Sequence, residues 1–129
     1  MAWEMKTDRP IYIQIVERLK MRIVSGEYPP GSKIPSVRDL AAEAGVNPNT
    51  MQKALGDLER EGLLHTQRTN GKTVTEDEQL IGKMLDSIAV EETEIYLTKL
   101  EGLGMDAGDG VNLVQRVAGS KSKYDTGEL

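Results

Sequence analysis

A helix-sized segment that begins at Pro48 carries amide, hydroxyl and amino side chains close to its start. Once its apolar positions are turned inward, the polar residues left on the other side are Asn49, Thr50, Gln52 and Lys53. Amide groups can pair with two atoms of an adenine edge, threonine can meet a base methyl or a phosphate, and lysine can reach guanine or phosphate. The free backbone N–H groups of a helix start also attract phosphate. These residue types therefore indicate recognition of nucleic acid rather than catalysis.

The element that must position these residues is a helix running from Pro48 to about Glu61. Its apolar residues recur at the i, i+3, i+4 and i+7 spacing of one helical face, namely Met51, Ala54, Leu55 and Leu58. Asn47 is the candidate N-cap, and proline is favoured at the first helical position after it. Asn47 has two possible roles, as a cap or as a DNA contact, and the two roles can coexist.

A second helix is predicted to open at Ser36 and to end at Gly45. The segment Ser36-Val37-Arg38-Asp39 resembles a capping box in which Asp replaces the usual Glu. Only Val46 separates Gly45 from Asn47, and two helices joined by so short a turn are typical of a helix-turn-helix. A plain corner between two helices has the same spacing, so both interpretations stay open on spacing alone.

Two side chains in the first turn of this helix are further candidates for DNA contact. Ser36 has the same two roles as Asn47, cap and contact. Arg38 lies opposite the apolar side of the helix. It is a contact to DNA, a solvated arginine, or the partner of Asp39 or Glu43 in an ion pair.

A β-hairpin is predicted directly after the two helices. Two β-prone runs, 63–67 and 72–75, flank Arg68-Thr69-Asn70-Gly71, and Asn-Gly is the strongest short-range hairpin signal. A hairpin in this position is a wing, with Arg68 and Lys72 near its tip to meet phosphates or a minor groove. The hairpin also has a structural role open to it, as the element that closes the core.

The beginning of the chain is predicted to be a loose arm, residues 1–7, followed by a helix. The apolar residues of that helix, from Ile11 to Val24, repeat every four positions: Ile11, Ile15, Leu19 and Ile23. The loop 27–35 is too rich in proline and glycine for a helix, with room for a short edge strand at Lys33-Ile34.

Composition removes most catalytic and metal chemistry. The chain has no cysteine and one histidine, His65, which we interpret as a structural or surface residue. Glu91, Glu92 and Glu94 have no histidine beside them and are expected to form a solvated acidic face. The glycine-rich segment 104–110 lacks the Gly-Lys-Ser/Thr ending of a phosphate loop. We therefore expect no catalytic residue, no metal and no cofactor, and the protein is not expected to be an enzyme.

The net charge of −5 argues against nucleic acid only until it is divided along the chain. Residues 1–75 carry 11 Lys and Arg against 9 Asp and Glu, whereas residues 76–129 carry 5 against 12. All the candidate DNA contacts fall in the first part, which has a net charge of +2. Charge at contact range is set by near neighbours, so the total is a poor guide to the partner.

The acidic second part is predicted to be helical. Apolar residues are spread along 76–104. This pattern is compatible with one long helix or with two helices separated by a break near 90–93. So long an apolar stripe cannot be buried by a three-helix domain alone, and its partner is either a short last helix, 111–117, folding back or a second subunit. The polar stretch 119–129 is expected to be disordered.

Several motifs in order resemble the N-terminal domain of the GntR family of bacterial transcription regulators. The match runs over about residues 9–75, and the segments that carry it are Pro10–Ile15, Gly26–Gly31, Ile34–Ala41, Gly45–Met51 and Leu58–Leu63. The short second part resembles the YtrA-type branch, in which a small helical tail dimerises, and the segment Leu97–Met105 carries this resemblance. One departure is Pro48, where some subfamilies place an arginine that reads bases, so their operators are not transferred to this chain.

The resemblance implies a mainly α fold with a small β wing and a homodimeric repressor in the cytoplasm, on the nucleoid, bound to a palindromic DNA operator. It implies a winged helix-turn-helix domain at 8–75 and a dimerisation tail at 76–118. No membrane segment is expected, because no stretch of the sequence approaches the roughly 20 apolar residues needed to span a membrane. The implied DNA contacts are Ser36, Arg38, Asn47, Asn49, Thr50, Gln52, Lys53, Arg68, Asn70, Gly71 and Lys72. A function of another class stays open, that of a winged-helix protein–protein adaptor without DNA binding.

Overall fold

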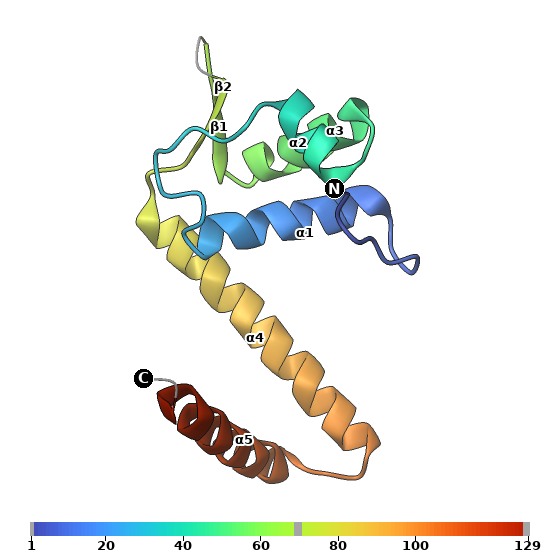
Figure 1. The fold of residues 1–129 in the computed structure, drawn as a ribbon, viewed down its shortest axis with the longest axis vertical. Coiled ribbons are helices and arrows are strands. Elements are labelled where there is room, and N and C mark those ends of the chain that lie inside the picture. The colour runs from blue at the N-terminus through green and yellow to red at the C-terminus, as the bar shows by residue number, and fades with distance from the viewer. Residues whose placement is uncertain (1, 69–70, 128–129) are drawn as a thin grey trace. The chain divides into compact units, whose positions relative to one another are not determined.

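The computed structural model describes residues 2–68 and 71–127 and consists of helices with one small hairpin (Figure 1). The elements in chain order are α1 (Ile11–Val24), α2 (Val37–Ala44), α3 (Pro48–Arg60), β1 (Leu64–Gln67), β2 (Gly71–Val74), α4 (Glu78–Gly102) and α5 (Ala107–Gly127). They form two compact units, Met1–Leu85 and Asp86–Leu129. Each unit is described by itself below. The mainly α fold class with a β wing is confirmed.

The core of the first unit lies between α1, α2 and α3. In Figure 1, α2 and α3 lie on the same side of α1. The predicted stripes point inward, since the buried side chains are Ile15, Leu19 and Ile23 from α1, Leu40, Ala41 and Ala44 from α2, and Met51, Ala54, Leu55 and Leu58 from α3. Ile11, the first member of the α1 stripe, is instead 48% exposed because the helix begins there. Each helix therefore turns its polar face outward.

The two helices of the helix-turn-helix, α2 and α3, are delimited by two N-caps and one glycine. The Ser36 hydroxyl accepts a hydrogen bond from the Asp39 amide at 3.1 Å, and the Asn47 side chain accepts one from the Asn49 amide at 2.7 Å. Gly45 ends α2 with a φ of +75°, a left-handed conformation in which a side chain would be strained. The predicted helix-turn-helix is therefore confirmed, including the predicted caps Ser36 and Asn47 and the helix end at Gly45.

The predicted hairpin is also confirmed. β1 and β2 pair antiparallel, with Leu64 opposite Val74 and Gln67 opposite Gly71. Lys33 forms an isolated antiparallel bridge to Thr73, which confirms the short edge strand predicted at Lys33-Ile34. Leu64 and Val74 are buried, so the base of the hairpin closes the core, whereas Thr66 and Gln67 further along β1 are exposed.

The prediction of a loose N-terminal arm is wrong. The Trp3 ring lies between the guanidinium groups of Arg18, 5.1 Å from its centroid, and Arg22, 4.8 Å away. Its indole N–H donates to Glu43 Oε2 at 2.9 Å, and its backbone N–H donates to the Ala44 carbonyl. These contacts come from α1 and α2, and no local sequence pattern signals them.

The helix α4 is continuous through residues 90–93, where a break was one of the two predicted alternatives. Thr93 is a weak helix former, but it does not interrupt the helix here. Its hydroxyl donates a hydrogen bond of 2.8 Å to the Ala89 carbonyl one turn earlier. In the first unit, Leu80, Ile81 and Met84 of α4 pack against the core. The first unit thus reaches Leu85, ten residues beyond the hairpin end predicted at 75.

The helix α5 is longer than the predicted 111–117. Asp106 and Asp109 exchange backbone-to-carboxylate hydrogen bonds, both 2.9 Å long, which is a capping box that starts the helix at Ala107 despite the glycines there. The backbone is helical to Gly127, within the stretch 119–129 that was expected to be disordered, and residues 128 and 129 lie outside the described part. This stretch contains no proline that would end the helix earlier.

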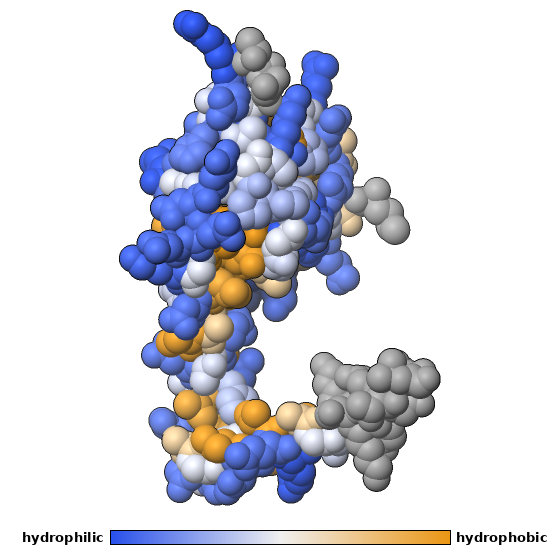
Figure 2. Space-filling model, turned by 90° about the vertical axis from the view of Figure 1, so that its left-hand side faces the viewer, coloured by the Kyte–Doolittle hydropathy of each residue, from blue (hydrophilic) through white to orange (hydrophobic). Residues whose placement is uncertain are grey.

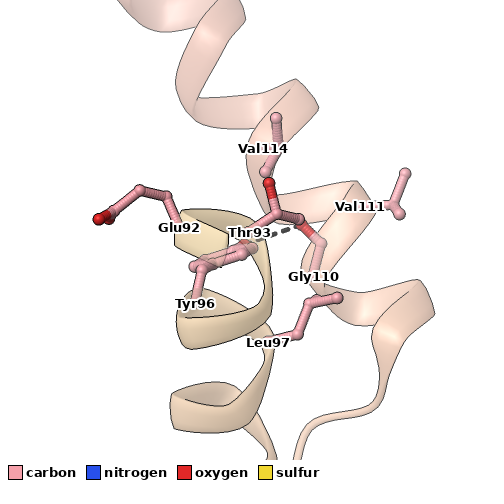
Figure 3. A pocket seen from close by; sticks show the side chains of 7 residues that line it. All are labelled: Glu92, Thr93, Tyr96, Leu97, Gly110, Val111 and Val114. Atoms are coloured by element: carbon pink, nitrogen blue, oxygen red, sulfur yellow. Dashed lines mark hydrogen bonds between the residues drawn. The ribbon is translucent and has the colours of Figure 1, made fainter. Parts of the chain in front are cut away.

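In the second unit α4 and α5 approach closely at one glycine. The Tyr96 hydroxyl of α4 donates to the Gly110 carbonyl of α5 at 2.8 Å (Figure 3). Gly110 is buried, and a Cβ added there would lie 2.7 Å from Leu97 Cδ2 and 3.2 Å from Leu100 Cδ1. The absence of a side chain at Gly110 is what allows the two helices to approach so closely.

Candidate nucleic-acid interface

The beginning of α3 presents a polar surface made of the residues that the sequence singled out. Asn47, Asn49, Gln52 and Lys53 are exposed, and Thr50 is half-buried. The opposite side of the helix is fully buried in the core, so the orientation of this polar face is fixed. Such a face offers donors and acceptors that match base edges and phosphates.

Lys53 is held by a residue that sequence reasoning did not select. Its ammonium nitrogen lies 3.9 Å from the ring centroid of Tyr12 in α1. A cation over an aromatic face is attracted by the ring quadrupole, so Tyr12 restricts where Lys53 can point. Tyr12 lies beside the apolar stripe of α1 and is half-buried. Its contact with Lys53 is seen only in the packing of α1 against α3 and not in the sequence.

Ser36 and Arg38 lie at the start of α2. Ser36 is confirmed as the cap of that helix. Arg38 is exposed, and within residues 2–68 and 71–127 no ion pair involves it. Glu43, one of its two predicted partners, instead pairs with Arg22, with Arg22 Nη2 lying 2.5 Å from Glu43 Oε2. The Arg38 guanidinium is therefore available to an external anion.

Glu43 completes a cluster that joins α1, α2 and the N-terminal arm. The hydrogen bond from Arg22, then that from Trp3, holds the pKa of the Glu43 carboxyl below its usual value against the opposing effect of burial. Arg22 also donates to the Tyr28 hydroxyl at 2.7 Å. The charges of this cluster are satisfied internally, which sets it apart from Arg38.

The predicted wing residues divide into two groups. Arg68 is exposed at the end of β1, and Gly71 opens β2 with a φ of +71°. Lys72, by contrast, is only 12% exposed and donates to Glu59 Oε1 at 2.8 Å and to Thr66 Oγ1 at 2.9 Å. Asn70 lies outside the described residues. Of the predicted wing cations, Arg68 is thus the one without an ion pair in the part of the chain that is described.

The described residues offer few groups for other kinds of function. His65 is an exposed residue of β1, as a surface histidine should be. The described residues contain no group of three or more His, Cys, Asp or Glu side chains placed to hold a metal ion. No helix among them is both long and apolar enough to cross a membrane.

The second unit carries apolar side chains on its surface rather than polar recognition groups. Its large exposed apolar residues are Val90, Ile95, Leu103, Val111, Val114 and Val117. Apolar surface gathers along α4 and at the turn to α5 on the face seen in Figure 2. Between α4 and α5 a groove is lined mainly by apolar side chains, including Tyr96, Leu97 and Val114 (Figure 3). Among the described residues these side chains stay exposed, and exposed apolar surface of this kind is typical of interaction sites.

Three packed helices, the second and third joined by a tight turn and followed by a two-stranded hairpin, define a winged helix-turn-helix protein. The model of bacterial regulatory proteins of the gntR family matches residues 11–74. The transcriptional regulator YhcF of Bacillus subtilis is 33% identical over 102 residues, which are 79% of this chain and 84% of YhcF. The chain belongs to the GntR family.

Other relatives agree with this membership. The transcriptional repressor YtrA of Bacillus subtilis is 43% identical over 72 residues, which span 56% of this chain and 55% of YtrA. A GntR family transcriptional regulator from Listeria monocytogenes has a TM-score of 0.80 and 36% identity, covering 87% of this chain and 98% of that one. These relatives are transcriptional regulators and not enzymes.

A solved complex supplies the comparison for the interface. The AraR DNA-binding domain, solved with its operator ORX1, has a TM-score of 0.54 and 30% identity to this chain. The match covers 58% of this chain and 95% of the AraR domain. The winged domain described above is thus similar to a domain that binds an operator.

Proposed function

We propose that this chain is a homodimeric repressor that binds a palindromic operator through the exposed face of α3. The single observation that carries the proposal is the exposed polar face at the start of α3, together with the exposed Arg38, which no ion pair involves in the described part of the chain. In helix-turn-helix proteins the N-terminal residues of the second helix contact base edges in the major groove. The similarity to the AraR domain and to YtrA, a named repressor, supports both DNA binding and repression.

The contacts divide by chemistry. Asn49, Thr50 and Gln52 would read bases, because their groups match base edges. Arg38, Lys53 and Arg68 would bind phosphates, and the caps Ser36 and Asn47 leave nearby backbone N–H groups free for the same purpose. The wing predictions for Asn70, Gly71 and Lys72 stay predictions.

The dimer is proposed to form through residues 76–118, with 8–75 as the DNA-binding domain. Val111, Val114 and Val117 are each more than half exposed on α5. Covering such surface is worth about 25 cal/mol per Å² of apolar area removed from water. A second copy offers the same apolar surface, and a two-fold dimer would present two recognition helices to two half-sites.

DNA binding is tested by titrating the promoter of the chain's own operon with the full-length protein at two salt concentrations. Arg38→Ala should weaken binding and reduce the slope of log K against log salt by about 0.9, the value for one phosphate contact on duplex DNA. Arg60→Ala is the matched control, because it removes the same charge from a side chain that pairs with Asp57 at the far end of α3. No binding by the wild type at either salt concentration would leave the adaptor function as the better account.

The dimer is tested by light scattering on the full chain. Val114→Asp should give monomers, because it places a charge on apolar surface that a second copy must cover. Asn112→Asp adds the same charge at an exposed polar position of the same helix and should leave the dimer intact. A Val114→Asp variant as dimeric as the wild type would contradict the role given to the tail.

A further inference from the structure

One carboxylate joins the end of α3 to both strands of the wing. Glu59 Oε1 accepts a hydrogen bond from Lys72 Nζ of β2 at 2.8 Å, and Glu59 Oε2 accepts one from the Thr66 hydroxyl of β1. Lys72 also donates to Thr66 Oγ1 at 2.9 Å, which closes the triangle. Glu59, Thr66 and Lys72 are called the wing clamp below.

The wing clamp is partly shielded from water. The Lys72 side chain is 12% exposed and that of Glu59 is 33% exposed. Hydrogen bonds between charged groups in such a setting are stronger than those of solvated surface pairs. The pKa of Glu59 is accordingly held below its usual value, chiefly by the hydrogen bond from Lys72 and next by that from Thr66.

The wing clamp lies where the core no longer reaches. At the base of the hairpin, Leu64 and Val74 are buried, but Thr66 and Gln67 further along β1 are exposed. Among the described residues, the side-chain hydrogen bonds from α3 to the hairpin all come from Glu59. The other side-chain bonds of the hairpin, such as Gln67 to Thr73, stay within it.

We propose that Glu59 is a positioning residue that fixes the wing relative to the recognition helix α3, and that Lys72 acts on DNA binding by holding the wing rather than by contacting phosphate. The inference rests on the proposed DNA-binding function. It reassigns Lys72, which the sequence had grouped with Arg68 as a cation for DNA. Arg68 keeps that role because it lies exposed beyond the wing clamp.

The first test separates positioning from direct contact by salt dependence. Lys72→Met should weaken binding to operator DNA severalfold and leave the slope of log K against log salt unchanged, because no phosphate contact is lost. Loss of a direct contact would reduce that slope by about 0.9. The reversed pair Glu59→Lys with Lys72→Glu should bind within about threefold of the wild type, since it restores the ion pair. A slope reduced by about 0.9 in Lys72→Met, or a reversed pair no better than Lys72→Glu alone, would overturn the proposal.

The second test needs no DNA, so it stands even if the proposed function fails. Glu59→Gln should speed amide hydrogen exchange in the outer hairpin, at Gln67 and Thr73, of the full-length protein. The matched control is Glu61→Gln, which removes a neighbouring carboxylate that pairs with Lys20 of α1 at 2.9 Å and not with the wing. Equal exchange in the two variants would overturn the wing clamp. A wild-type protein that fails to bind DNA would instead overturn the proposed DNA-binding function, on which the role of the wing clamp in binding rests.

Discussion

The Lys53 ammonium lies 3.9 Å from the centre of the Tyr12 ring, so a cation of α3, the proposed recognition helix, is held by an aromatic side chain of α1. The pair makes α1 a support for the proposed DNA-binding face of α3. It also links the position of a predicted phosphate contact to the packing of α1 on α3.

This link predicts a small and specific loss on removing the ring. Tyr12→Leu should weaken DNA binding about two- to fivefold, because a partly exposed cation–π contact is worth about 0.5–1 kcal/mol. Tyr12→Phe keeps the aromatic face and should bind as the wild type does. Fluorescence anisotropy on labelled operator DNA measures both variants, and a Phe variant as weak as the Leu variant would show that the ring is not what matters.

The cap of α3 predicts a loss of stability. Asn47→Ala removes the acceptor for the Asn49 amide and should lower the free energy of unfolding by about 1 kcal/mol, as measured by urea denaturation. Asn47→Ser keeps a capping oxygen and should recover most of that loss. If the Asn47→Ala and Asn47→Ser variants are equally stable, the Asn47 side chain does not stabilise the protein as a helix cap.

The Glu43 cluster predicts a dependence of stability on pH. The pKa of Glu43 is lowered from its usual value of 4.5, chiefly by Arg22, so the folded state favours the ionised carboxylate. Its contribution is therefore fully present above about pH 4.5 and is lost as the pH falls through the lowered folded-state pKa. Trp3, the one tryptophan of the chain, reports unfolding by its fluorescence.

The variant Glu43→Gln isolates this contribution. It should be less stable than the wild type at pH 7, and the difference should shrink on acidification below pH 4.5. Glu27→Gln, which removes the more exposed partner of Arg22, is the control and should change that pH dependence little. A Glu43→Gln variant whose stability falls with pH as steeply as that of the wild type would refute the assignment.

The close approach of α4 and α5 predicts opposite effects at two glycines. Gly110→Ala adds a Cβ that would lie 2.7 Å from Leu97 Cδ2, so it should lower the thermal stability of the second unit. Gly119→Ala meets nothing within 4 Å and should raise helix stability by about 0.5–1 kcal/mol. Circular dichroism melts of both variants make the comparison, and a stabilised Gly110→Ala would show that the helices pack elsewhere.

The sequence was sufficient for the elements that periodicity and caps define. The spacing of Met51, Ala54, Leu55 and Leu58 predicted both the buried face of α3 and the polar face opposite it. Gly45 and Asn47 predicted the turn, because their roles depend on adjacent backbone alone. The predicted members of the site on α2 and α3 are accordingly all placed at the surface, with Thr50 half-buried.

What the sequence did not predict are contacts between side chains far apart in the chain. Trp3 and Glu43 are 40 positions apart, and Lys20 and Glu61 are 41 apart. Neither pair follows from a local period, since each depends on how the helices pack. The same reason explains why Lys72 was grouped with Arg68, because its partner Glu59 lies on another element.

The central claim is that the exposed side chains of α3 read base sequence, and selection from a random DNA library tests it most directly. We predict that the wild type selects a palindrome and that Asn49→Ala or Gln52→Ala relaxes the preference at symmetric positions of both half-sites. Arg38→Ala should select the same sequence with lower affinity, because phosphate contacts carry no sequence information. An unchanged preference in both α3 variants, or a selected sequence without two-fold symmetry, would contradict the account.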